Sequence, residues 1–368
     1  MKLHIEKSLL MDAINTVIRA VPAKSSVPAL EGLLLDAQCE TLTVSAYNMQ
    51  LGIRTRYSAE ISEEGRIVAN AKLFSDIIRK MPDDTVTIEC GGDLSMSLKC
   101  GSVKYNIMAL PADEYPELPE LGESNSMEIP EATLKSMISD TIFAVSTNET
   151  RPVQTGELFE IKDGKLNIVA CDGFRLAVRT ETVECADAEF VVPGATLNEV
   201  ERLCAESKST VKISVGDRNV MFYIGETELI SRRLEGSFLE WRNVIPKNNP
   251  VTVKVNAKYM MQSIDRVSVV VNEKLKSPMK CKIGMGEIVF STKTAIGAAN
   301  DKCKVDGDGK DLVIGFNNRY LGDALRYCPE AEVNMSFKDT VSPALITAVD
   351  GNDRFKYMVL PVRLKTDA

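Results

Sequence analysis

The side chains that most often carry out chemistry are few in this sequence, and their spacing fits none of the common catalytic sites. There are nine cysteines but no C-x-x-C pair, and one histidine, His4. An odd number of cysteines without close pairs argues against a disulfide framework and against a zinc site, so we expect nine reduced, mostly buried thiols. A two-histidine metal site is excluded, and a histidine triad or a histidine general base could involve only His4. We expect His4 to be an ordinary strand residue.

Phosphate-binding loops are also missing. Neither G-x-x-x-x-G-K-[ST] nor G-x-G-x-x-G occurs, and the glycine pairs at 91–92 and 306–309 are typical of turns. These absences lower the expectation of catalysis without eliminating it. We predict no metal and no cofactor.

Length and composition are those of a globular protein with two or three domains. The chain has 368 residues, of which 44% are hydrophobic and 26% are charged. No apolar run reaches the roughly 18 residues needed to cross a membrane, and the N-terminus lacks the features of a signal peptide. We therefore predict a cytoplasmic protein.

An amphipathic helix recurs three times. Segments 7–21, 131–145 and 257–270 each follow an alternating strand and place apolar residues at i, i+3 and i+4. A second helix recurs around Leu73, Leu197 and Leu321, which are 124 residues apart, and each copy precedes an alternating strand. A weaker echo joins 45–55 to 170–180 at an offset of 125, and its third copy near 290–299 is faint.

These echoes predict an α+β fold of three similar domains, each a twofold β-α-β-β-β repeat. The predicted bounds are 1–122, 127–246 and 250–368. Segment 110–126 is rich in proline and acidic residues, as a surface linker should be, and 244–250 is predicted to serve as the second join.

Charge is distributed unevenly along the chain. The net charge is −8, yet the predicted helices 7–19, 72–80, 131–141, 196–208, 256–267 and 319–327 together carry a small positive excess. Helices sharing one wall would face DNA phosphates favourably. The same charges also fit ordinary solvated helix faces, and 196–208 is acidic, so charge alone leaves both readings open. The absence of recognition motifs argues against base-specific readout.

Five segments carry a resemblance to a known family: 27–37, 171–180, 192–200, 234–246 and 357–364. Through them the whole chain resembles the bacterial DNA polymerase III beta subunit family, the β sliding clamps. The resemblance implies three DNA-clamp domains per chain and a head-to-tail homodimeric ring with helices lining the hole. It further implies a processivity factor, without catalytic activity, that encircles double-stranded DNA and is nucleoid-associated.

The resemblance also implies a peptide-binding pocket between the second and third domains. Its partners would be DNA polymerase III alpha and other polymerases, the clamp loader, mismatch-repair proteins and other proteins with clamp-binding motifs. Apolar walls with adaptable methionine and leucine suit a peptide anchor that many partners share. The alternative is that these residues form the core at strand ends. The matching positions are Cys171, Gly173, Phe174, Arg175, Leu176, Leu239, Asn243, Val244, Met358, Leu360, Pro361, Val362, Arg363 and Leu364.

Two further sets follow from the same resemblance. The DNA-facing candidates are Lys24, Lys72, Arg79, Asn148 and Arg151, although the loops at 23–28 and 147–156 could be simple solvated turns. The dimer interface would pair Tyr105 and Ile107 with Val269 and Val270 of a second copy, unless the apolar segment 269–274 packs within its own domain.

Two other functions compete with the ring. One is a monomeric or open-chain scaffold that uses the same pocket without encircling DNA. The other is a DNA-acting enzyme, which would show nuclease or transferase turnover.

Overall fold

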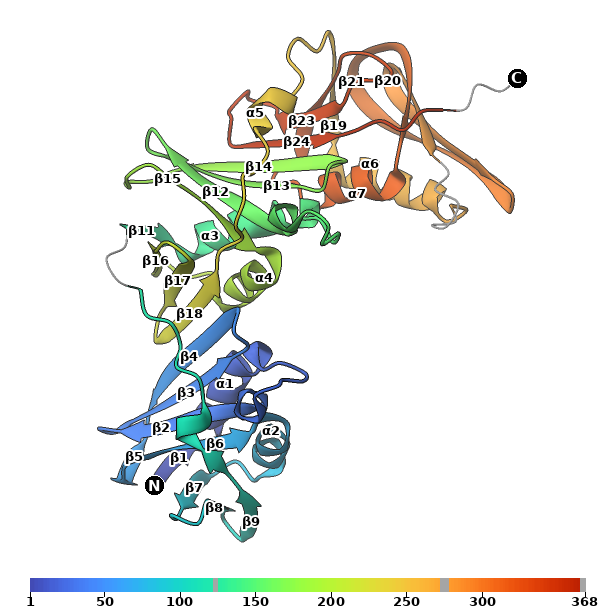
Figure 1. Cartoon of the computed structure of the whole chain (residues 1–368). Coiled ribbons are helices and arrows are strands. Elements are labelled where there is room, and N and C mark those ends of the chain that lie inside the picture. The colour runs from blue at the N-terminus through green and yellow to red at the C-terminus, as the bar shows by residue number, and fades with distance from the viewer. Residues whose placement is uncertain (122–124, 272–277, 365–368) are drawn as a thin grey trace. The chain divides into compact units, whose positions relative to one another are not determined.

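The computed structural model describes residues 1–121, 125–271 and 278–364. The chain forms two compact units, one of residues 1–134 and 199–233 and the other of 135–198 and 234–368. Figure 1 labels their helices and strands along the chain. Among the described residues, no helix is long and apolar enough to cross a membrane.

The first unit contains two antiparallel sheets. Their strand orders are β5-β1-β7-β8-β9 and β10-β6-β2-β3-β4-β18-β17-β16-β11. The elements are β1 (Lys2–Glu6), α1 (Lys7–Val17), β2 (Gly32–Gln38), β3 (Thr41–Tyr47), β4 (Leu51–Ser58), β5 (Glu60–Glu63), β6 (Gly65–Asn70), α2 (Ala71–Lys80), β7 (Thr85–Cys90), β8 (Ser95–Cys100), β9 (Val103–Met108), β10 (Leu110–Pro111), β11 (Asn125–Pro130), β16 (Thr210–Val215), β17 (Asn219–Ile224) and β18 (Thr227–Arg232).

The second unit is built on one sheet of ten strands, in the order β15-β12-β13-β14-β24-β23-β22-β19-β21-β20. Helices α3 (Glu131–Ser139) and α4 (Gly194–Leu203) have residues in both units. The remaining elements are β12 (Gly156–Lys162), β13 (Lys165–Cys171), β14 (Arg175–Thr182), β15 (Ala188–Pro193), α5 (Trp241–Val244), β19 (Val251–Asn256), α6 (Ala257–Ser268), β20 (Met279–Thr294), β21 (Gly297–Phe316), α7 (Asn318–Arg326), β22 (Glu332–Phe337), β23 (Ala344–Ala348) and β24 (Phe355–Val359).

Helix positions follow from caps and apolar spacing. Asn70, Asn256 and Asn317 each precede a helix, and each side-chain Oδ1 accepts a hydrogen bond from a backbone N–H in the first turn. In α6 and α7 the apolar stripe, which includes Met260 and Leu321, packs on the phenylalanines of the sheet. All six predicted helices and the strands before and after them are confirmed, with α4 beginning earlier and ending sooner than predicted.

The predicted surface linker at 110–126 is wrong in its first part. Leu110 and Pro111 form β10 and pair with β6, and Tyr115 is only 5% exposed against Leu34 and Tyr47. Proline and acidic residues dominated the composition and hid this one aromatic anchor, whose burial stabilises the segment on the sheet.

The offset of 125 for the weaker echo is also wrong by one residue. Tyr47 pairs with Gly52 and Cys171 with Leu176, so the equivalent hairpins are 124 residues apart. The Arg-Thr dipeptides at 54–55 and 179–180, which are 125 residues apart, therefore occupy different register positions. In the third repeat, the faint copy lies in two long strands, β20 and β21, which pair from Met279↔Phe316 to Thr294↔Gly297 with register shifts around Met285.

The simple side-chain expectations hold. His4 lies in β1, and its Nδ1 is 2.9 Å from Thr87 Oγ1 on the neighbouring strand. Most of the cysteines are buried, and only Cys39 is exposed.

Candidate functional site

The site begins at the tight turn between β13 and β14. The Asp172 Oδ1 accepts hydrogen bonds from the backbone N–H groups of Phe174 at 2.8 Å and Arg175 at 3.0 Å. Gly173 between them has φ +87°, a left-handed conformation that suits glycine. This turn leaves the Phe174 side chain 56% exposed.

The C-terminal strand brings its own residues to the same place. β14 pairs with β24, with Leu176 opposite Met358. Beyond β24, the Leu360 N–H donates to the Phe174 carbonyl at 2.8 Å, and the Val362 N–H donates to the Gly315 carbonyl at 2.8 Å. Segment 358–362 is therefore held beside the turn by backbone hydrogen bonds.

An apolar cluster lies under one end of this strand pair. Cys171, Leu176 and Met358 are at most 5% exposed and pack with Phe238 and Trp241. Burial raises the pKa of the Cys171 thiol, so this side chain stays neutral. The cluster is continued by Leu158, Val169, Val178 and Val191, with Val153, Leu234, Val244 and Ile245 at its edge.

Helix α5 is anchored to the cluster by an ion pair. The Arg242 Nη1 and Nη2 both lie 2.6 Å from the carboxylate oxygens of Glu160 on β12. Burial is the largest single influence on Glu160 and raises its pKa, but the hydrogen bonds and charge of Arg242, together with the hydrogen bond from Asn167, outweigh burial in sum and lower the pKa. The Arg242 guanidinium also lies 4.1 Å from the Trp241 ring centroid. These contacts hold Trp241 in the cluster.

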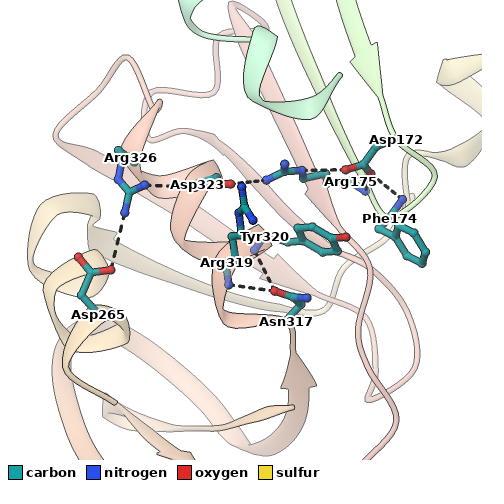
Figure 2. A network of polar contacts seen from close by, with 9 residues as sticks. All are labelled: Asp172, Phe174, Arg175, Asp265, Asn317, Arg319, Tyr320, Asp323 and Arg326. Atoms are coloured by element: carbon teal, nitrogen blue, oxygen red, sulfur yellow. Dashed lines mark hydrogen bonds and ion pairs between the residues drawn. The ribbon is translucent and has the colours of Figure 1, made fainter. Parts of the chain in front are cut away.

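A chain of ion pairs crosses the other side of the turn (Figure 2). Arg175 is only 8% exposed and donates to Asp172 Oδ2 at 3.0 Å and to Asp323 Oδ2 at 2.7 Å. Asp323 also accepts from Arg326, whose other guanidinium nitrogen lies 3.7 Å from Asp265. A buried cation with two carboxylate partners is well compensated. The network therefore fixes the turn relative to α6 and α7 within this unit.

Aromatic rings surround the same arginine. Its guanidinium carbon lies 4.7 Å from the Tyr320 ring centroid and 5.3 Å from that of Phe143. Phe174 and Tyr320 stack with centroids 5.8 Å apart. The turn thus presents an aromatic surface that is rigidly backed.

A cavity of about 1250 Å³ opens beside this surface. This volume is somewhat larger than the roughly 300–1,000 Å³ of a typical ligand pocket, so the cavity has room for a small ligand or a peptide side chain. Of the predicted pocket residues, the cavity is lined by Phe174, Arg175, Leu360, Pro361, Val362 and Arg363.

The predicted pocket residues therefore fall into two neighbouring groups. Cys171, Leu176 and Met358 belong to the apolar cluster, with Val244 at its edge, and the six residues above line the cavity. Gly173 shapes the turn, and Leu364 lies against Gly315. Leu239 is 37% exposed and Asn243 is exposed, and neither lines this cavity.

Several residues of the site were missed by sequence reasoning. Tyr320, Asp323 and Trp241 carry central contacts. The asparagine before α7 could have drawn attention to Tyr320, because the same cap precedes α2 and α6. No local signal identifies Asp323, which is 148 residues from its partner Arg175.

The DNA-facing candidates of the first unit are all exposed. Lys24 lies in the loop before β2, and Lys72 and Arg79 lie on α2. Arg79 donates to Asp76 at 3.2 Å and to Ser75 at 3.2 Å, so part of its hydrogen-bonding capacity is already used.

The DNA-facing candidates of the second unit are Asn148 and Arg151, and both are exposed in the loop after α3. The Asn148 Oδ1 accepts from the Thr150 N–H at 3.0 Å, which orders this loop locally.

Two of the dimer candidates, Tyr105 and Val269, are exposed, whereas Ile107 and Val270 are half-buried. Tyr105 and Ile107 are on β9, the last strand of the five-stranded sheet, and Tyr105 is 38% exposed. Val269 follows α6 and is 81% exposed, whereas Val270 is half-buried and its carbonyl accepts from Thr294. Residues 272–274 of the predicted apolar segment lie outside the described residues.

Comparison with known proteins gives a consistent result along the whole chain. Three family models match in order: the DNA polymerase III beta subunit N-terminal domain at residues 1–119, its central domain at 128–240 and its C-terminal domain at 242–363. A protein named beta sliding clamp from Halalkalibacterium halodurans is 32% identical over 98% of this chain and 98% of its own length. One of the same name from Bacillus subtilis is 30% identical over 99% and 100%.

Solved structures agree. The crystal structure of the DNA polymerase sliding clamp from Bacillus subtilis superposes with a TM-score of 0.95 at 29% identity, covering 99% of this chain and 100% of that one. The DNA polymerase III subunit beta from Pseudomonas aeruginosa superposes with a TM-score of 0.94 at 26% identity, with the same coverage.

Proposed function

We infer the function from the family: the chain belongs to the DNA polymerase III beta subunit family and is a DNA sliding clamp, a non-catalytic processivity factor. The observation that carries this conclusion is the consecutive match of all three family domains, together with a TM-score of 0.95 to a sliding clamp over 99% of the chain. The three-domain α+β fold predicted from the repeats agrees with this family. A homodimeric ring follows from membership.

The ring is tested by mass and by topology. Sedimentation of the purified protein is expected to give the mass of a dimer. Loaded onto nicked circular DNA, the ring is expected to stay bound through gel filtration in salt, and to be lost once the circle is cut. Release before cutting, or a strict monomer, would instead support the open-chain scaffold.

The domain bounds 1–122, 127–246 and 250–368 are proposed from the repeats. They are supported by the recurrence of strand and helix in each segment. Sheets run across the proposed joins, because β4 pairs with β18 and β14 pairs with β24. Because strands pair across the proposed domain boundaries, the two compact units divide the chain at other positions, after residues 134, 198 and 233.

We propose that the turn, the apolar cluster and the cavity together receive short peptides from polymerases. Rigid aromatic and aliphatic residues beside a cavity suit an anchor side chain. The clamp loader, mismatch-repair proteins and other motif-bearing proteins are proposed as further partners. The residues involved would be Cys171, Gly173, Phe174, Arg175, Leu176, Leu239, Asn243, Val244, Met358, Leu360, Pro361, Val362, Arg363 and Leu364.

We propose that Lys24, Lys72, Arg79, Asn148 and Arg151 face the duplex. Their exposure supports this, and contacts of this kind to phosphates carry no sequence information. A clamp that works on chromosomal DNA is expected in the cytoplasm, associated with the nucleoid.

We propose that Tyr105 and Ile107 of one copy meet Val269 and Val270 of the other. An exposed edge strand and an 81% exposed valine are both features that association would cover. Val269→Asp is expected to shift sedimentation toward monomer. Val341→Asp, at another exposed valine, should leave the dimer intact.

A further inference from the structure

A second, smaller pocket lies in the first unit, at the place that the apolar cluster occupies in the second repeat. This polar pocket has a volume of about 180 Å³ and lies between β2, β3 and β4 and the segment that follows β10 (Figure 1). Strand pairing makes the two places equivalent, because the same pairs recur 124 positions later. The pairs are Leu34↔Ser45 and Ser45↔Arg54 in the first repeat, and Leu158↔Val169 and Val169↔Val178 in the second.

The lining of the polar pocket is hydrophilic where its counterpart is apolar. Ser45 and Arg54 stand where the second repeat has Val169 and Val178, which pack in the apolar cluster. The charged lining residues are Asp36, Arg54, Arg66, Glu117 and Glu120, and the apolar ones include Leu34, Pro116 and Leu118. One position in the repeat is therefore a filled apolar core in one copy and a pocket with charged walls in the other.

Hydrogen-bonding capacity in this lining is unused. The Arg54 side chain is 27% exposed and lies 3.5 Å from Glu228, and its Nε–H makes no hydrogen bond with any residue that the structure describes. Asp36 is 25% exposed and pairs with Arg66 through Oδ2 at 3.2 Å, whereas its Oδ1 accepts no hydrogen bond from the described part of the chain. A donor and an acceptor without partners are costly, so a ligand that pairs with both is favoured.

The charge of Asp36 is also incompletely compensated. Burial raises the pKa of this carboxyl by more than the charge of Arg66 and its other partners lowers it. Glu117 and Glu120 are exposed on the segment after β10, and neither forms an ion pair with a described residue. The polar pocket thus offers a guanidinium donor on one strand and carboxylate acceptors around it.

These charges discriminate against ions of either sign. An anion that reaches Arg54 also meets the three carboxylates of the lining, and a cation that reaches the carboxylates also meets two guanidinium groups. A neutral group that has both a donor and an acceptor avoids both repulsions. A primary carboxamide is such a group, since its oxygen accepts and its NH₂ donates.

We propose that the polar pocket binds small neutral primary carboxamides: the carboxamide oxygen accepts from Arg54, its NH₂ donates to Asp36, and the rest of the ligand rests on Leu34, Pro116 and Leu118. The volume of about 180 Å³ equals that of about six water molecules and suits a small ring compound. This site lies in the other compact unit from the peptide site and has a separate function.

The test compares three compounds of nearly the same shape on the intact dimer. Benzamide is neutral, benzoate is an anion and benzamidine is a cation. Saturation-transfer NMR measures the binding of each in titration. Benzamide is expected to bind at least fivefold more tightly than either charged compound.

Two substitutions assign the binding to the polar pocket. Ser45→Val introduces the residue that the second repeat has at this position and is expected to weaken benzamide at least fivefold, because the larger side chain narrows the pocket. Arg54→Lys keeps the charge but removes the Nε–H, and is expected to weaken benzamide about three- to tenfold, the effect of one hydrogen bond. Ser214→Val is the matched control, because Ser214 is also 4% exposed, lies on β16 of the same sheet and does not line the pocket.

Each outcome decides the proposal. Weaker binding in Ser45→Val and Arg54→Lys but not in Ser214→Val supports it, provided that each variant still sediments as a dimer. Unchanged binding in both pocket variants places benzamide elsewhere and overturns it. Tighter binding of benzoate or benzamidine overturns the neutral preference, and no benzamide binding up to its solubility limit overturns the site. Retention on circular DNA tests the clamp function separately.

Discussion

Two joints in the molecule share one backbone design and differ in their side chains. The first joint is the β4–β18 pair with the turn before β4, and the second is the β14–β24 pair with the turn before β14. In the first turn, the Asn48 Oδ1 accepts hydrogen bonds from the backbone N–H groups of residues 50 and 51. In the second turn, the Asp172 Oδ1 accepts in the same way from residues 174 and 175. The Gln50 carbonyl accepts from Arg232 at 2.9 Å, just as the Phe174 carbonyl accepts from Leu360 at 2.8 Å.

The side chains then diverge. At the first joint, Arg54 and Arg56 pair with Glu228 across the strands, and the two arginine side chains are 27% and 38% exposed. At the second joint, Arg175 is buried between two carboxylates and two rings, and Phe174 is left exposed beside a cavity. The repeat thus supplies the same joint twice, and only side-chain differences make one of them a candidate peptide-binding site.

The largest expected difference between the joints concerns their arginines. Arg175→Ala leaves Asp172 and Asp323 without their shared buried cation and is expected to reduce the free energy of unfolding by about 3–5 kcal/mol. Arg56→Ala removes an ion pair whose arginine side chain is 38% exposed, and should cost no more than about 1 kcal/mol. Urea unfolding of both variants at one protein concentration measures the difference, and equal losses would contradict the contrast.

A smaller effect is expected at the two turns. Gly173 has φ +87° with nothing near the position of a Cβ, so Gly173→Ala adds only backbone strain, about 1–2 kcal/mol. Met49 occupies the equivalent position with φ +72° and already bears that strain. Met49→Gly is therefore expected to be neutral within about 0.5 kcal/mol, because relief of strain and the added entropy of the unfolded chain oppose each other. Thermal unfolding measures both, and a large loss in Met49→Gly would show that the turns are not equivalent.

The smallest expected effect depends on pH and concerns the Glu160–Arg242 ion pair, which anchors α5 to the apolar cluster under the second joint. The pKa of Glu160 is lower in the folded chain than its ordinary value of 4.5, so its pairing with Arg242 stabilises the protein fully above pH 4.5. That stabilisation is lost as the pH falls through the lowered folded value. The difference in unfolding free energy between the natural protein and Arg242→Gln should therefore be constant from pH 7 to 5 and shrink below it. Lys247→Gln, an exposed neighbour without a described partner, should show no such trend.

Much of the architecture was predictable because it is encoded locally. Apolar residues at helical spacing, such as Leu10, Ala13 and Ile14, bury one face wherever the helix packs, and alternating strands do the same with a period of two. Repetition of these patterns at 124 residues revealed the internal repeat. The resemblance, rather than periodicity, suggested the residues of the candidate site.

The failures have equally physical causes. Composition at 110–126 indicated a linker, yet a single buried tyrosine and a two-residue strand hold its first part to the sheet. The offset of 125 matched residue identities, whereas the hairpin register that sets side-chain direction is 124.

Six amphipathic helices, the strands beside them and the order in which the unit recurs were all predictable without any tertiary information. Which joint lies beside the cavity of about 1250 Å³ is a tertiary property, because it depends on partners such as Arg175 and Asp323, which are 148 residues apart. Neighbouring residues fix backbone periodicity through short-range sterics and hydrogen bonds. Distant charges and rings can pair only after the strands of the sheet have paired, because strand pairing brings the strand ends together.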